Sequence, residues 1–118
     1  WVPKRVVAVF QPHRFSRTAQ FMERFAQALS SADEVLLAPL YSAGEAPIEG
    51  VSSAALAEQV QINGQSARAF ADMDSLVEAV QEISNEGDLV LVMGAGDVNQ
   101  LWDRMQADAD RKGLATAA

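Results

Sequence analysis

A short basic segment near the start of the chain carries the residues best suited to chemistry. Residues 11–18 read Gln-Pro-His-Arg-Phe-Ser-Arg-Thr, so Arg14 and Arg17 stand three positions apart beside His13. If a helix starts here, two arginines at this spacing point to the same side, next to backbone N–H groups without helical partners. A guanidinium binds a carboxylate or phosphate through two parallel hydrogen bonds. The pattern predicts a site for a small anion, although a solvated helix start with surface ion pairs fits it equally well.

The charge of the chain is unevenly distributed, and this favours a small ligand. The net charge is −7, yet residues 1–24 carry five basic residues and one acidic residue, whereas residues 25–118 carry four basic and fifteen acidic ones. An acidic protein offers no broad positive field to nucleic acid. No apolar run is long enough to span a bilayer. We therefore expect neither nucleic acid nor a membrane among the partners.

A glycine-rich turn follows the apolar run that ends at Met93. Gly94, Ala95 and Gly96 resemble the start of a dinucleotide-binding fingerprint, but Asn99 stands where the third glycine belongs. The turn is therefore a weak cofactor signal. Glycine still allows the backbone to approach a ligand closely.

The sequence contains no complete set of catalytic residues. It has no cysteine and a single histidine, which rules out thiolate chemistry and a multi-histidine zinc site. It also has no Walker A motif, no nucleophile elbow and no paired-histidine metal motif. We predict no catalytic residue and no metal site within these 118 residues.

Alternating apolar segments must position these loops. Short apolar runs predict strands at 5–10, 34–37, 67–70 and 88–93. Residues at helical spacing predict helices between them. The expected caps are Ser16 or Thr18 for the first helix, Ser52 or Ser53 for the second, and Asp74 or Ser75 (with a Ser75-x-x-Glu78 capping box) for the third. The expected ends are Asn63-Gly64 for the second helix and Gly87 for the third, and a last helix carries Val98, Leu101, Trp102 and Met105 on its apolar face.

This alternation predicts an α/β fold, namely a three-layer Rossmann-like, mainly parallel sheet with helices on both faces. Ligands of such sheets bind beyond the carboxyl ends of the strands. The loops 11–17, 39–51, 71–74 and 94–97 are therefore expected to meet at one edge. The length allows one domain, placed at residues 1–106, and the loss of apolar periodicity predicts a frayed or disordered tail at 107–118.

Three segments together resemble the carboxy-terminal domain of the Mur ligases, ATP-dependent enzymes of bacterial peptidoglycan synthesis. They are residues 9–18, 41–48 and 89–97, which read VFQPHRFSRT, YSAGEAPI and LVLVMGAGD. Their order and spacing match the member that joins L-alanine to UDP-N-acetylmuramate, and the resemblance runs from about residue 4 to residue 105. Phe15 and Ser16 stand where the family often has Tyr and Thr.

The resemblance implies a cytoplasmic, three-domain bacterial enzyme, of which this chain, beginning at Trp1, is the third domain. An amino-terminal domain would hold the UDP-sugar, and a central domain would hold ATP and Mg²⁺. The carboxy-terminal domain, a Rossmann-like sheet with one antiparallel strand, would close over both and place the amino acid. Such ligases activate the muramyl carboxylate as an acyl phosphate, which the amine of L-alanine attacks. The isolated chain is therefore expected to bind no ATP or Mg²⁺ and to be inactive.

The resemblance also implies roles for individual residues. Arg14 and Arg17 are expected to hold the carboxylate of L-alanine, in agreement with the chemistry of their guanidinium groups, and His13 lies beside them. Tyr41 and Glu45, from the long loop at 39–51, are expected at the rim of the closed site. The backbone of the glycine turn (Gly94, Ala95 and Gly96) is expected near the amino acid.

Three other functions fit parts of the pattern. The related ligase that recycles whole muropeptides belongs to the same class, but its matching loops are expected to differ from this His-Arg-x-x-Arg arrangement. A non-catalytic Rossmann-like module would bind a small anion without neighbouring domains. A dinucleotide-binding module would bind NAD or NADP, and the missing third glycine counts against it.

Overall fold

A four-stranded parallel sheet with the order β3-β2-β1-β4 forms the centre of the molecule. The computed structural model describes residues 2–94, 97–101 and 103–105. Its strands are β1 (Arg5–Phe10), β2 (Glu34–Leu37), β3 (Ser66–Ala69) and β4 (Asp88–Met93). β1 pairs with β2 on one side and with β4 on the other, so the loop that follows β1 leaves from the interior of the sheet.

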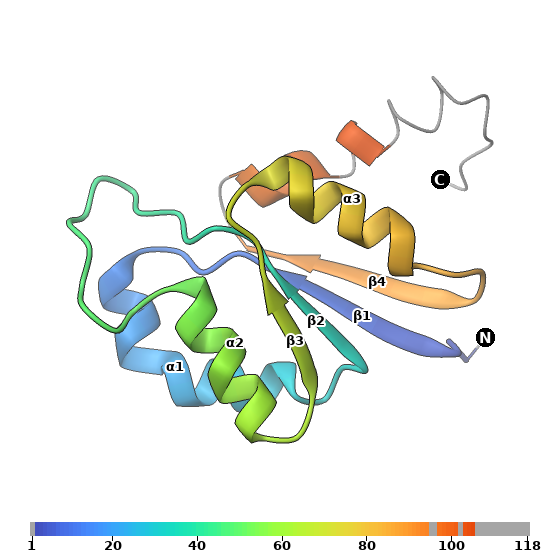
Figure 1. The fold of residues 1–118 in the computed structure, drawn as a ribbon, viewed down its shortest axis with the longest axis horizontal. Coiled ribbons are helices and arrows are strands. Elements are labelled where there is room, and N and C mark those ends of the chain that lie inside the picture. The colour runs from blue at the N-terminus through green and yellow to red at the C-terminus, as the bar shows by residue number, and fades with distance from the viewer. Residues whose placement is uncertain (1, 95–96, 102, 106–118) are drawn as a thin grey trace.

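The helices form layers on both faces of this sheet (Figure 1). They are α1 (Phe15–Leu29), α2 (Ser53–Ile62), α3 (Met73–Ile83) and the short 3₁₀ helix η1 (Asp97–Gln100). Figure 1 shows α1 and α2 on one face and α3 on the other, the face on which η1 also packs. The predicted three-layer, Rossmann-like α/β fold is confirmed.

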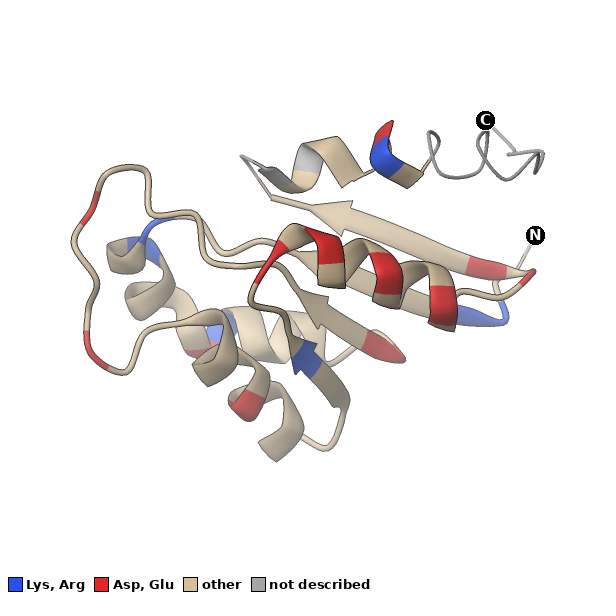
Figure 2. Ribbon diagram, turned by 45° about the horizontal axis from the view of Figure 1, so that its top comes forward, with Lys and Arg blue, Asp and Glu red and all other residues tan. Residues whose placement is uncertain are grey.

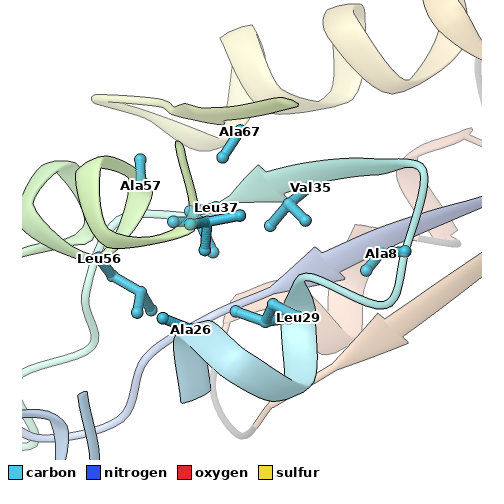
Figure 3. Packing of buried hydrophobic residues seen from close by; sticks show 10 residues of the cluster. Ala8, Ala26, Leu29, Val35, Leu37, Leu56, Ala57 and Ala67 are labelled. Atoms are coloured by element: carbon cyan, nitrogen blue, oxygen red, sulfur yellow. The ribbon is translucent and has the colours of Figure 1, made fainter. Parts of the chain in front are cut away.

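Side chains that alternate along the strands separate into two cores. Val35 and Leu37 of β2 point toward α1 and α2, where they meet Leu29 and Leu56 (Figure 3). Leu36, between them, points to the opposite face. There it belongs to a second cluster, which includes Val7, Val9, Leu76, Val80, Val98 and Leu101. Each of these buried Val or Leu side chains contributes roughly 1.5–3 kcal/mol by leaving water. A strand buried on both faces explains why its apolar run is continuous.

Most of the expected element boundaries are confirmed. The strands at 5–10, 34–37 and 88–93 are found as predicted, and the weak third strand begins one residue early, at Ser66. Ser52 caps α2, because its side chain accepts a hydrogen bond from the N–H of Ala55 at 3.0 Å. At the other end of α2, Asn63 is the C-cap residue, and Gly64 follows with a φ of 93°.

Three predictions about helix ends are wrong. Asp72, not Asp74 or Ser75, caps α3, because its carboxylate accepts from the N–H of Ser75 at 2.7 Å. α3 also ends at Ile83, before Gly87, which instead forms the turn into β4 with a φ of 92°. Neither Ser16 nor Thr18 caps α1, which starts after Arg14.

Two further expectations concern parts of the sheet and the chain end. All of the strands in the described residues pair in parallel, so the antiparallel strand implied by the resemblance is not among them. Val98 and Leu101 are fully buried and Met105 packs against the same core, as predicted for the last helix. Trp102 and the tail at 107–118 lie outside the described residues.

Candidate functional site

Three loops meet at the carboxyl edge of the sheet, as predicted. The backbone of residues 12–14 pairs with Tyr41 of the loop after β2: the Tyr41 N–H donates to the Pro12 carbonyl at 2.9 Å, and the Arg14 N–H donates to the Tyr41 carbonyl at 2.7 Å. On the other side, the N–H of Gln11 donates to the carbonyl of Met93, the last residue of β4, at 3.0 Å. Figure 1 shows the loops after β1, β2 and β4 at the same end of the sheet.

The side chain of Gln11 connects the basic segment to the loop after β2 and to η1. It is 1% exposed. Its Nε2 donates to the carbonyl of Pro39 at 3.0 Å, and its Oε1 accepts from the N–H of Val98 at 3.0 Å. The sequence alone does not predict this role for Gln11, because only the folded chain brings residues 39 and 98 to it. A polar residue directly after a buried strand, at the sheet edge where ligands bind, is the local signal that was available.

Gly94 occupies a position that only glycine fits. Its φ is 135°, and a Cβ there would lie 2.9 Å from the carbonyl oxygen of Gln11 and 3.2 Å from a methyl carbon of Val98. The close approach of Gly94 to Gln11 and Val98 is therefore possible only because glycine has no side chain. Ala95 and Gly96, the other predicted backbone contacts, lie outside the described residues.

Arg14 and Arg17 stand at the start of α1, and both are exposed. Within the described part of the chain, neither guanidinium forms a hydrogen bond or an ion pair. Together they line a hollow of about 470 Å³, whose other walls are His13, Ser16, Gln20 and Phe21. Two guanidiniums on the wall of one open hollow, with their hydrogen-bond donors unused within the described residues, suit a negatively charged ligand.

The backbone of Arg14 is held in a conformation that favours glycine. Its φ is 67° and its ψ is 140°. Its carbonyl accepts from the N–H of Thr18 at 3.1 Å and from the Thr18 hydroxyl at 2.8 Å, while its N–H is bound by Tyr41. Thr18 is fully buried. These three hydrogen bonds hold the strained residue in place, as is found where strain is kept at functional positions.

His13 and Tyr41 form a stacked pair at the rim. Their ring centroids are 5.5 Å apart with an interplanar angle of 8°. His13 and Arg17 also line a second hollow of about 250 Å³, together with Phe10, Gln11, Phe25 and Gly94. His13 thus lies between the two hollows, one largely polar and one partly aromatic.

Glu45 reaches from the loop after β2 to the first turn of α1. Its carboxylate accepts from the N–H of Ser16 at 3.0 Å and from the Ser16 hydroxyl at 2.7 Å. These two hydrogen bonds hold the pKa of Glu45 below its usual value, and the positive charge of Arg14 adds to the effect. Glu45 therefore acts as the side-chain cap that neither Ser16 nor Thr18 provides, since it satisfies an N–H group at the start of the helix.

The acidic residues of α3 lie on the opposite face of the sheet from α1, which carries the basic segment. Figure 2 shows basic residues at the start of α1 and a row of acidic residues along α3. The described residues contain no cluster of three or more His, Cys, Asp or Glu side chains that would hold a metal ion. They also contain no helix long and apolar enough to cross a membrane. The two guanidiniums are suited to bind and orient an anion.

Comparison with known proteins identifies the family. Residues 1–96 match the family model described as Mur ligase, glutamate ligase domain. The chain belongs to this family. Its relatives include a UDP-N-acetylmuramate–L-alanine ligase of Synechococcus sp. (strain RCC307), which is 80% identical over all 118 residues. This Mur ligase domain covers 25% of the length of that relative.

More distant relatives carry the same name. A UDP-N-acetylmuramate–L-alanine ligase of Parasynechococcus marenigrum (strain WH8102) is 54% identical over 107 residues, which is 89% of this chain and 23% of the relative. Another, from Xylella fastidiosa (strain 9a5c), is 42% identical over 109 residues, which is 92% of this chain and 23% of the relative. The Mur ligase domain thus spans about a quarter of the length of the proteins that it matches.

Proposed function

We propose that this chain is the amino-acid-positioning domain of an ATP-dependent ligase that joins L-alanine to UDP-N-acetylmuramate in bacterial peptidoglycan synthesis. The relatives named UDP-N-acetylmuramate–L-alanine ligase support the reaction. The observation that carries the role of this domain is the pair of exposed guanidiniums at the start of α1, which line one hollow and form no hydrogen bond within the described residues. The comparisons do not favour a stand-alone anion-binding or dinucleotide-binding module.

In this proposal Arg14 and Arg17 bind the carboxylate of L-alanine. Charge-assisted hydrogen bonds to a carboxylate contribute about 1.5–3 kcal/mol each. Held by its carboxylate, the amino acid presents its amine toward the acyl phosphate in the neighbouring domain, which lowers the entropic cost of the attack. His13 contacts the substrate or the neighbouring domain from the position between the two hollows.

The other predicted residues shape the site in this proposal. Tyr41 stacks on His13 and so fixes its ring, and ionised Glu45 holds the loop after β2 against α1. Gly94 brings backbone close to the amino acid, with Ala95 and Gly96 assigned to the same turn. We place the whole unit at residues 1–106.

ATP and Mg²⁺ belong to other parts of the enzyme in this proposal. The sequence lacks a P-loop, and the described residues lack a set of metal ligands, so this domain does not fit either group. We assign both to a central domain and UDP-N-acetylmuramate mainly to an amino-terminal domain, in a ligase that works in the bacterial cytoplasm. The domain described here then acts as a lid that brings the amino acid to them.

The test is a reconstituted reaction of the full-length ligase that contains this domain. ATP, Mg²⁺, UDP-N-acetylmuramate and L-alanine are supplied, and the nucleotide-linked product is identified by mass spectrometry. We expect an amide with L-alanine and no turnover of ATP by the isolated chain. A full-length enzyme that forms no amide with L-alanine would refute the proposed reaction.

A further inference from the structure

Among the described side chains, the buried amide of Gln11 is the one that hydrogen-bonds both to the loop after β2, at Pro39, and to η1, at Val98. We propose that Gln11 is a positioning residue for amino-acid binding. Its amide sets the distance between the loop after β2, η1, and the basic segment with Arg14 and Arg17. The inference rests on the proposed function, because it concerns the geometry of the same site.

Both ends of the amide are in use, and the group is shielded from water. Nε2 donates to the Pro39 carbonyl and Oε1 accepts from the Val98 N–H, each at 3.0 Å, in a residue that is 1% exposed. An apolar side chain of the same length would leave the donor at Val98 and the acceptor at Pro39 unpaired. A buried polar group without a partner is destabilising, and we expect the segments around it to separate and admit water to it.

The backbone between Gln11 and Arg14 is short and restrained, so a change in the position of Gln11 also moves Arg14. Arg14 is three residues further along the chain, and Pro12 restricts the backbone between them. The carbonyl of Pro12 is bound by Tyr41, and the backbone of Arg14 is bound by Tyr41 and Thr18. Movement of either flanking loop therefore shifts the first turn of α1 as a unit, rather than being absorbed along the way.

Gln65 provides a matched control within the same domain. Its Nε2 also makes two hydrogen bonds to backbone carbonyls, those of Ser30 and Ala32, each at 3.0 Å. It directly precedes β3, at the amino end of the sheet and away from the anion site. Replacing Gln65 removes two hydrogen bonds of the same kind but leaves the three loops of the site connected.

The experiment uses the full-length ligase with Gln11→Met, Gln11→Glu or Gln65→Met, and measures thermal unfolding together with steady-state kinetics for each substrate. Because a misplacement of about 1 Å can reduce the rate about 100-fold, we expect Gln11→Met to lower kcat/KM for L-alanine at least about tenfold. The KM for ATP should change less than about twofold, and Gln65→Met should leave both parameters near wild type. If Gln11→Met and Gln65→Met lower the unfolding temperature by a similar amount, lost stability cannot explain why only Gln11→Met lowers kcat/KM for L-alanine.

If Gln11→Met does not fold, Gln11→Glu tests the positioning role of Gln11. The new carboxylate of Gln11→Glu accepts from the Val98 N–H but donates nothing to Pro39, so kcat/KM for L-alanine should again fall. Equal kinetic effects of the Gln11 and Gln65 variants, or normal L-alanine kinetics in both Gln11 variants, would overturn the proposal. A wild-type enzyme without L-alanine ligase activity would instead refute the proposed function, and the reconstituted reaction with the wild-type enzyme distinguishes that case.

Discussion

The two roles of Arg14, as a guanidinium and as a strained backbone, can be separated by comparing Arg14→Gly with Arg14→Ala. The side chain is exposed, so Arg14→Ala should leave the free energy of unfolding nearly unchanged. Arg14→Gly relieves a backbone with φ 67°, which costs about 1–2 kcal/mol for a residue with a side chain. The greater freedom of glycine in the unfolded chain offsets about 0.5–1 kcal/mol of this gain.

Arg14→Gly should therefore be more stable than Arg14→Ala by about 1 kcal/mol, or about 4 °C in unfolding temperature for a domain of this size. Thermal unfolding followed by circular dichroism measures the difference. Both variants lose the same guanidinium, so both should raise the KM for L-alanine about 10- to 100-fold in the full-length ligase. Arg14→Lys should recover only part of the loss, because an ammonium cannot make the two parallel hydrogen bonds.

Arg17→Ala should produce a similar rise in the KM for L-alanine, with smaller changes for ATP and the UDP-sugar. If Arg14→Ala and Arg17→Ala both keep a normal KM for L-alanine, the carboxylate assignment is wrong. If the KM for ATP alone rises, the segment serves the nucleotide or domain closure instead. If Arg14→Gly is no more stable than Arg14→Ala, the inference of backbone strain fails.

Three further outcomes follow from the structure. The hydrogen bonds from Ser16 lower the pKa of Glu45 in the folded protein, so ionised Glu45 contributes stability that is fully present above its ordinary pKa of 4.5. This contribution is lost as the pH falls through the folded-state pKa. Because Glu45→Gln removes the contribution, its free energy of unfolding in urea should change less with pH in this acid range than that of wild type. Gly94→Ala should destabilise the domain by about 2 kcal/mol or more, because it combines a positive φ with a contact of 2.9 Å, whereas Gly44→Ala, with open space around it, should cost about 1 kcal/mol in the same thermal unfolding assay. Ser52→Ala should cost about 1 kcal/mol through the lost cap of α2, and a Ser52→Asp variant of normal stability would provide the control.

The sequence predicted β1 and β2 well because burial on both faces produces a continuous apolar run. β4 was also placed with correct ends from its apolar run, although Leu91 and Met93 are exposed in the structure. β3 was weaker because only Ala67 of its residues is buried, and its predicted start was one residue late. The convergence of the basic segment, the loop after β2 and the glycine turn followed from strand order along the chain and the parallel sheet.

The contacts that complete the site could not be predicted from local pattern. Glu45 caps α1 from 29 residues away, so searching for a cap beside the helix led to Ser16 and Thr18 instead. Gln11 meets a partner 87 residues away, at Val98. The positive φ of Arg14 has no signature in the sequence, since glycine or asparagine would be expected there. Tertiary contacts override local preference at each of these three positions.

The position of β1 between β2 and β4 has a consequence for how the domain folds. Arg5 and Asp88, an ion pair at the start of the paired strands, are 83 residues apart in the chain. Joining them costs loop-closure entropy before the contact gives any stability, and such distant pairings slow folding. During synthesis β1 leaves the ribosome before β4, so the backbone N–H and C=O groups on its β4-facing edge remain unpaired until β4 has been made. The strand that anchors the anion site is thus among the last to be fully paired, and a chain that stops before β4 would expose that edge to other molecules.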